Sequence, residues 1–155
     1  EENDVELDVI LGDASGPLPF PDDHFDGLVS LELIEHIADW RALVAQMVRV
    51  VKPGGRLAIS TPSQHGLAQV VKTFALRTGL KAETTYEWFI PRRQMVEDLS
   101  SRGVKLTGMT EVVLTAPMLP DAVMPIVRQI ERLSERTPWL NRLCSTTIYC
   151  GVKAG

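Results

Sequence analysis

The chain has 155 residues, of which 45% are hydrophobic and 23% are charged, and its formal net charge is −4 at pH 7. This length suits one domain built around a single core. The acidic balance provides no basic surface that would favour a nucleic acid or an anionic membrane. No apolar run approaches the roughly 18 residues that a membrane span needs. A globular protein is expected, with nucleic acid disfavoured as a partner.

The start of the chain, Glu1–Asp4, has neither the basic residues nor the apolar stretch of a signal peptide. It also lacks an initiator methionine, and an expected strand follows at once, so we expect an upstream segment in the parent protein. On an extended strand Cys144 and Cys150 would lie too far apart for a disulfide. Two reduced thiols indicate a reducing compartment, and the cytoplasm is the expected location.

The first part of the chain predicts strands that alternate with a connection and a helix. Three short apolar runs are typical of strands: Val5–Leu11, Phe25–Leu31 and Arg56–Thr61. The second run is of the kind that is buried on both faces of a parallel sheet. Asp39 offers an N-cap for a helix that extends to Val51, and Lys52–Gly55 ends that helix. This order is typical of a layered α/β sheet.

The later part predicts further helices and strands. The expected helices are Gln64–Thr78, Pro91–Arg102 and Pro120–Arg136, and the expected strands are Val104–Thr115 and Thr147–Val152. The last two strands are separated by one helix and some loop, so they can pair antiparallel at an edge of the sheet. Tyr86, Trp88 and Phe89 precede the Pro91 helix, where they would either line an acceptor pocket or pack in the core.

Several short motifs follow one another in residues 5–62. They are Gly12-Asp13-Ala14, Leu18-Pro19-Phe20, Phe25-Asp26, Glu35-His36 and Val51–Leu57. In this order and spacing they resemble the middle of class I S-adenosylmethionine-dependent methyltransferases, among them O-methyltransferases of the ubiquinone pathway. The resemblance implies a Rossmann-like sheet in a three-layer α/β/α arrangement whose final strand runs antiparallel. It also implies that residues 1–155 are the C-terminal portion of one methyltransferase domain, with a helical insertion at residues 117–142.

The resemblance assigns S-adenosylmethionine as the cofactor and places its adenine beside Asp13 and Ala14. In a doubly wound sheet, ligands bind beyond the carboxyl ends of the strands, and Asp13 follows such an end. A carboxylate there can accept a hydrogen bond from the adenine amine, although aspartate is also a common turn former that binds its own backbone. Ser30 and Leu31 end the next strand, where the resemblance implies the methionine portion of the cofactor.

Two parts of the family pattern have no counterpart in this chain. The glycine-rich loop after the first family strand cannot be placed, because Gly12 and Gly16 follow the match to the third strand. The acidic residue that ends the second strand is also missing. Two strand–helix units, on the order of 60 residues, are therefore expected upstream. Without them the sheet would expose an edge and the cofactor site would be incomplete.

The pentapeptide Glu32–His36 (Glu-Leu-Ile-Glu-His) concentrates ionisable side chains. If it turns helically, Glu32, Glu35 and His36 share one face and could bind a divalent cation. The same pentapeptide resembles the Mg²⁺ site of ubiquinone-pathway catechol O-methyltransferases and of small-RNA 2′-O-methyltransferases. Alternatively, His36 acts as a general base or binds substrate without a metal. Residues 84–89 lack the further histidine of the metal-using families, so Mg²⁺ stays an alternative.

Together these features predict methyl transfer from S-adenosylmethionine to a small-molecule acceptor, with a hydroxyl oxygen as the expected nucleophile and with carbon and nitrogen acceptors left open. His36 or Glu35 is the expected base. Two other functions remain open. One is a non-catalytic methyltransferase-like module that binds a partner through its open sheet edge. The other is an RNA 2′-O-methyltransferase, which the acidic charge disfavours. A homodimer is an open possibility for the assembly.

Overall fold

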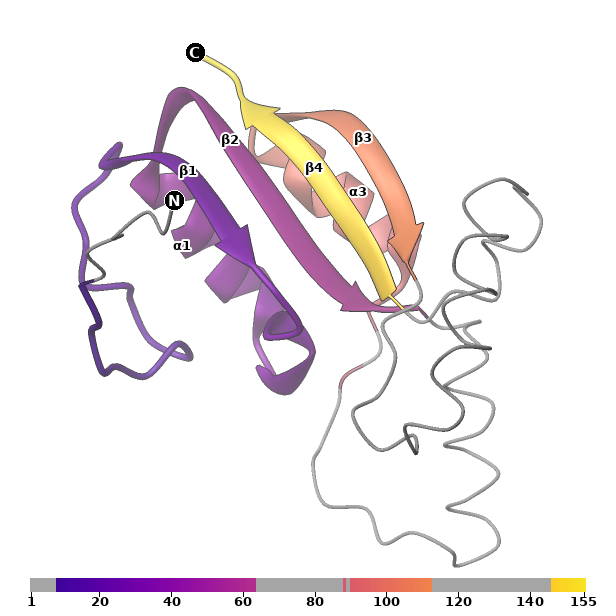
Figure 1. Cartoon of the computed structure of the whole chain (residues 1–155), viewed down its shortest axis with the longest axis horizontal. Coiled ribbons are helices and arrows are strands. Elements are labelled where there is room, and N and C mark those ends of the chain that lie inside the picture. The colour runs from indigo at the N-terminus through magenta and orange to yellow at the C-terminus, as the bar shows by residue number, and fades with distance from the viewer. Residues whose placement is uncertain (1–7, 64–87, 89, 113–145) are drawn as a thin grey trace, which may run out of the picture.

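The computed structural model describes residues 8–63, 88, 90–112 and 146–155. These residues form a four-stranded mixed sheet with the order β1-β2-β4-β3. The strands are β1 (Phe25–Ser30), β2 (Val51–Pro62), β3 (Val104–Val112) and β4 (Thr146–Lys153). The helices are α1 (Trp40–Val50) and α3 (Arg92–Ser101), and a short 3-10 turn, η1 (Ile34–His36), follows β1. Figure 1 shows α1 and α3 on the same face of the sheet.

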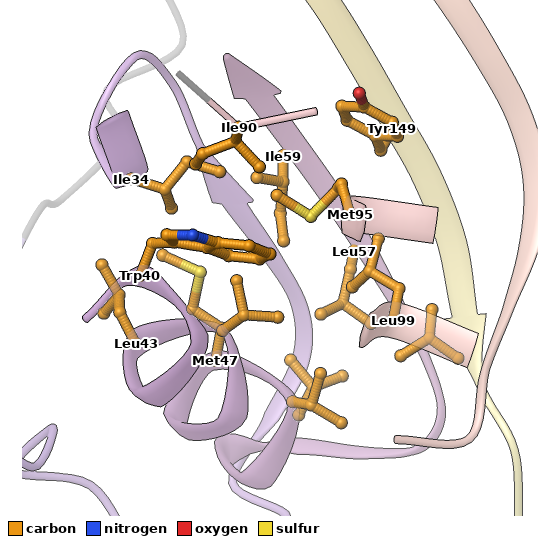
Figure 2. Packing of buried hydrophobic residues seen from close by; sticks show 14 residues of the cluster. Ile34, Trp40, Leu43, Met47, Leu57, Ile59, Ile90, Met95, Leu99 and Tyr149 are labelled. Atoms are coloured by element: carbon orange, nitrogen blue, oxygen red, sulfur yellow. The ribbon is translucent and has the colours of Figure 1, made fainter. Parts of the chain in front are cut away.

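The hydrophobic core lies between the sheet and these two helices (Figure 2). Its larger buried side chains are Ile34, Trp40, Leu43, Met47, Leu57, Ile59, Ile90, Met95, Leu99 and Tyr149. Burying one large apolar side chain contributes about 1.5–3 kcal/mol, so this cluster is the main source of stability in the described part of the chain. Because Ile34 belongs to η1 and is fully buried, the core also anchors the segment that carries Glu35 and His36.

The helix α1 begins where the sequence predicts. The Asp39 side chain accepts a hydrogen bond from the backbone N–H of Ala42 at 3.1 Å, and this satisfies one of the unpaired donors of the first turn. The chain then enters β2 through a bulge opposite Phe25 and Gly27, so β2 starts at Val51 instead of Arg56. A Cβ atom on Gly55 would lie 2.6 Å from Val51 Cγ1, which explains the glycine at this point of the bulge.

The topology confirms the predicted fold class. The strand β1 pairs with β2 in parallel, whereas β4 pairs antiparallel with both β2 and β3. The predicted antiparallel final strand is thus present, and α3 lies inside the predicted helix at Pro91–Arg102. The described residues provide the sheet and one helical layer of the expected three-layer arrangement. No helix in these ranges is long and apolar enough to cross a membrane.

Two sequence predictions were wrong where the structure describes the residues. Residues 8–11 of the expected first strand form no strand, and Leu11 is fully exposed, because no described strand lies beside them to complete backbone hydrogen bonds. The strand β1 is not buried on both faces: Val29 is 69% exposed, since no described helix covers the face opposite α1 and α3. The expected helices at 64–78 and 120–136, the insertion at 117–142 and Cys144 lie outside the described residues.

Candidate functional site

The candidate site lies at the end of the sheet where β1 stops beside the last residues of β2. Their parallel register pairs Ser30 with Ile59, so the residues that follow these two positions meet at one edge. All six buried polar residues of the described ranges belong to β1, η1, or the adjoining ends of β2 and β4: Ser30, Glu35, Ser60, Thr61, Thr146 and Thr147. Buried polar groups are more informative than buried apolar ones, because burial is costly for them unless they bind a partner.

Glu32 and Ser60 form a reciprocal contact at this edge. The Ser60 hydroxyl accepts a hydrogen bond from the Glu32 backbone N–H at 3.0 Å and donates one to Glu32 Oε1 at 2.9 Å. Glu32 has a left-handed backbone with a φ of 48°, so the helical turn of η1 does not extend back to Glu32. Sequence reasoning missed Ser60, because its partner is 28 residues away and only the strand register brings the two residues together.

Glu35 and His36 lie in η1, directly after the left-handed turn. Glu35 is almost fully buried, whereas the His36 side chain is 36% exposed, and the His36 Nε2 and Glu35 Oε1 atoms are 3.9 Å apart. The backbone N–H of Trp88 donates a hydrogen bond to the Glu35 carbonyl oxygen at 2.6 Å. This bond joins residue 88 to the Glu32–His36 motif, although the two are far apart in the sequence. The Trp88 side chain is half exposed.

The predicted three-residue metal site does not form a cluster in the structure. The described ranges contain no group of three or more His, Cys, Asp or Glu side chains arranged to hold a metal ion. The helical turn spans only Ile34–His36, and the left-handed Glu32 precedes it, so Glu32 does not share a helical face with Glu35 and His36. In addition, Ser60 binds one carboxylate oxygen of Glu32.

Asp13 forms a local turn in the segment before β1. The backbone N–H of Ser15 donates a hydrogen bond to Asp13 Oδ1 at 2.8 Å, and this bond holds the pKa of the Asp13 carboxyl below its ordinary value. The aspartate has therefore adopted the turn role that its residue type also predicts. Asp13 is nevertheless exposed, so the turn leaves the carboxylate accessible, while Ala14 packs partly against the core.

Arg49 holds the proline-rich connection that follows this turn. Its guanidinium donates hydrogen bonds to the Leu18 and Phe20 carbonyl oxygens and to Asp22 Oδ1, at 3.0, 2.8 and 2.6 Å. The last turn of α1 thus fixes the loop between Asp13 and β1. Sequence reasoning missed this role, because an arginine at the end of a helix is also typical of a simple interaction with the helix dipole.

Ser30 and Leu31, the other predicted cofactor residues, differ sharply in their surroundings. Ser30 is buried, and within the described part of the chain its Oγ has no hydrogen-bond partner. Leu31 is 65% exposed. The structure therefore brings Ser30, Leu31, Glu32 and Ser60 together at one end of the sheet, close to η1. The exposed Leu31 side chain lies next to the buried polar residues there.

Comparisons with known proteins show similarity of this chain to methyltransferases. A family model described as a methyltransferase domain matches residues 1–59. A ubiquinone/menaquinone biosynthesis C-methyltransferase from Shewanella halifaxensis is 28% identical over 117 residues, which cover 63% of this chain and 47% of that protein. A ubiquinone biosynthesis O-methyltransferase from Acinetobacter baylyi is 30% identical over 90 residues, with coverage of 56% and 38%.

A solved structure from Thermotoga maritima, described as an S-adenosylmethionine-dependent methyltransferase and possible histamine N-methyltransferase, superposes with a TM-score of 0.61. Its identity to this chain is 12%, and the match covers 92% of this chain and 62% of that one. The family model over residues 1–59 and the methyltransferase relatives support a class I S-adenosylmethionine-dependent methyltransferase. This confirms the family that the motifs predict. The chain spans less than half the length of the two curated relatives, at 47% and 38%.

Proposed function

We propose that the protein carrying this chain binds S-adenosylmethionine and transfers its methyl group to a small-molecule acceptor, with a hydroxyl oxygen as the nucleophile. This proposal rests on the layer of buried polar residues where β1 stops beside the last residues of β2. Ligands of open α/β sheets bind at such an edge. The family match over residues 1–59 includes Asp13, β1 and the Glu32–His36 motif, which supports a shared ligand at this edge.

In this proposal Asp13 and Ala14 bind the adenine end of the cofactor, and Ser30 and Leu31 lie beside its methionine end. Asp13 is suited to accept a hydrogen bond from an amine, because its lowered pKa keeps the exposed carboxylate ionised. Ser30 supports the second assignment. Its buried hydroxyl has no partner among the described residues, and a buried polar group without a partner is unfavourable unless a ligand or water supplies one.

His36 is the proposed base. Bond formation between the acceptor oxygen and the methyl carbon is accompanied by cleavage of the methyl–sulfur bond, whose electron pair stays on sulfur and leaves S-adenosylhomocysteine. The acceptor proton passes to the His36 imidazole, which is partly exposed and can therefore reach a bound substrate. Glu35 lies beside it, almost fully buried, and its carboxylate stabilises the imidazolium that forms. The protein otherwise contributes alignment of the oxygen, methyl carbon and sulfur.

Binding of Mg²⁺ is a separate part of this proposal. Glu32, Glu35 and His36 would be its ligands in this chain, and carboxylate oxygens suit that ion. To converge on one ion, Glu32 would have to leave its left-handed conformation and its hydrogen bond to Ser60. Activity measured with a chelator and with added Mg²⁺ tests this part without affecting the rest.

We also propose how this chain fits into a whole methyltransferase domain. The chain would be the C-terminal portion of one methyltransferase domain, with residues 117–142 as a helical insertion. The names of the two quinone-pathway relatives include both C- and O-methylation, so the choice of an oxygen acceptor rests on His36 as a base and not on those names. A homodimer remains compatible with this architecture and is tested by measuring the molar mass in solution.

The decisive experiment measures cofactor binding and methyl transfer separately. S-adenosylhomocysteine is titrated calorimetrically into the protein that contains this chain, and S-adenosylhomocysteine release is then followed with catechol, phenol and hydroxyquinone acceptors. Binding together with turnover of a hydroxylated acceptor is the expected result. Absence of cofactor binding would contradict the proposal and favour the non-catalytic binding module.

A further inference from the structure

Glu32 adopts a backbone conformation that is unfavourable for its residue type. In the described ranges only Asp23 and Glu32 are non-glycine residues with positive φ, at 53° and 48°. Aspartate tolerates the left-handed region in turns, because its short side chain can bind the local backbone, whereas glutamate is uncommon there. Such strain persists only where the surrounding structure holds it, and it is often found at functional sites.

Ser60 binds Glu32 in this conformation. Its buried hydroxyl lies on β2, the strand next to β1, and it binds both the backbone N–H and the side chain of Glu32. These two bonds close a ring that folds the carboxylate back toward its own backbone. The Glu32 carboxylate is thereby oriented at the end of β1, immediately after Ser30 and Leu31.

The fold alone does not require a glutamate at this position. A glycine would adopt the same backbone conformation without strain, and its N–H would still donate to the Ser60 hydroxyl. The carboxylate is thus the only group that the strained residue adds. A carboxylate accepts several hydrogen bonds at once, so the bond from Ser60 is compatible with a further one from a ligand. The buried Ser30 hydroxyl, which has no partner among the described residues, is a second and independent indication that a ligand binds at this edge.

We propose that Ser60 is a positioning residue that orients the Glu32 carboxylate to accept a hydrogen bond from a hydroxyl group of the methyl acceptor. This inference rests on the proposed function and specifies how the acceptor is recognised. Glu32 contacts the acceptor, while Ser60 acts only through Glu32. The cofactor keeps its proposed contacts at Asp13, Ala14, Ser30 and Leu31.

The first test compares steady-state kinetics of Ser60→Ala and Ser60→Thr, using the hydroxylated probe that the wild-type protein methylates best. Loss of a hydrogen bond to a charged group corresponds to roughly tenfold to a hundredfold, and we expect a decrease of this size in kcat/KM for the acceptor in Ser60→Ala. The dissociation constant for S-adenosylhomocysteine should stay unchanged. Ser60→Thr retains the hydroxyl and should restore most of the activity.

The second test uses Glu32→Gly and Glu32→Ala as a matched pair. Both lose the carboxylate and should lose acceptor kcat/KM equally. Only glycine relieves the left-handed strain, so Glu32→Gly should melt about 2–4 °C higher than Glu32→Ala. Equal losses of activity in two variants that differ in stability assign the loss to the missing carboxylate and not to the backbone strain.

The outcomes distinguish this inference from the proposed function. If the wild-type protein methylates no hydroxylated probe, the proposed acceptor chemistry fails and the inference fails with it. If the wild-type protein is active but all four variants match it, the Glu32–Ser60 pair is structural and the inference alone is wrong. If the variants weaken S-adenosylhomocysteine binding and leave the KM of the acceptor unchanged, the carboxylate serves the cofactor, which also overturns the inference.

Discussion

Two regions of this molecule bury side chains for different purposes. The sheet face beneath α1 and α3 buries a continuous apolar cluster, in which each member gains by leaving water. The edge where β1 and β2 end buries hydroxyls and a carboxylate instead, and it includes the strained Glu32. Burial of this second kind costs free energy unless partners compensate. The apolar face therefore stabilises the fold, whereas the polar edge is the part of the molecule that we propose binds the ligand.

The largest expected effect comes from the polar edge. His36→Ala should lower turnover by about a hundredfold to ten-thousandfold, the usual contribution of a general base. The affinity for S-adenosylhomocysteine and the melting temperature should stay near wild-type values, because His36 is at the surface of η1. Steady-state kinetics combined with calorimetry measure both quantities. Full activity in this variant would remove His36 from the mechanism.

The apolar face should respond in the opposite way. Leu99→Ala removes a buried side chain of α3 and should lower the free energy of unfolding by about 2–5 kcal/mol, since the transfer free energy is lost and a cavity remains. Denaturant titration measures this change. Leu31→Ala is the matched control, because the same substitution at a largely exposed leucine should change stability by less than about 0.5 kcal/mol. Equal losses at both positions would contradict the division between the two regions.

Asp13→Ala tests the proposed contact with the adenine of the cofactor. We expect S-adenosylhomocysteine to bind about tenfold more weakly, because a hydrogen bond to a carboxylate is lost, while the core remains intact. Asp13→Asn should lose less, since an amide oxygen can accept both the Ser15 N–H and the adenine amine.

The pH dependence of this contact follows from the lowered pKa of Asp13. The ionised form persists below the ordinary pKa of an aspartate, so this contribution to affinity is fully present above that value. The contribution of Asp13 to the affinity decreases only as the pH falls through the lowered pKa of the Asp13 carboxyl in the folded protein. Calorimetric titrations at decreasing pH check the sign, and affinity that rises on acidification would exclude Asp13 as an acceptor of the adenine amine.

The smallest expected effect is at the start of α1. Asp39→Ala removes the N-cap and should lower the free energy of unfolding by about 0.5–2 kcal/mol. Cofactor affinity and turnover should be unchanged, because the cap stabilises a helix of the apolar face. Thermal melting with parallel kinetics measures both. A specific loss of turnover in a folded Asp39→Ala protein would show that the helix start also belongs to the site.

Local patterns were sufficient to predict much of this fold. The Asp39 cap, the apolar periodicity of α1 and the Pro91 helix each depend on residues a few positions apart, and each was confirmed. The antiparallel pairing of the last two strands was also confirmed. By contrast, the expected strand at residues 8–11 and the burial of β1 on both faces failed at the described residues. Both depend on neighbours that a local pattern cannot supply.

The amino-acid sequence alone determined the order of the described helices and strands, the resemblance to methyltransferases and the position of Glu35 and His36 after β1, because these follow from short-range periodicity and motif spacing. The tertiary structure alone decided how the site is assembled. It brought Ser60 to Glu32, Trp88 to Glu35 and Arg49 to the Leu18–Asp22 loop. Each of these contacts joins residues more than 25 positions apart, and it exists only because strand register and core packing fix where distant segments meet.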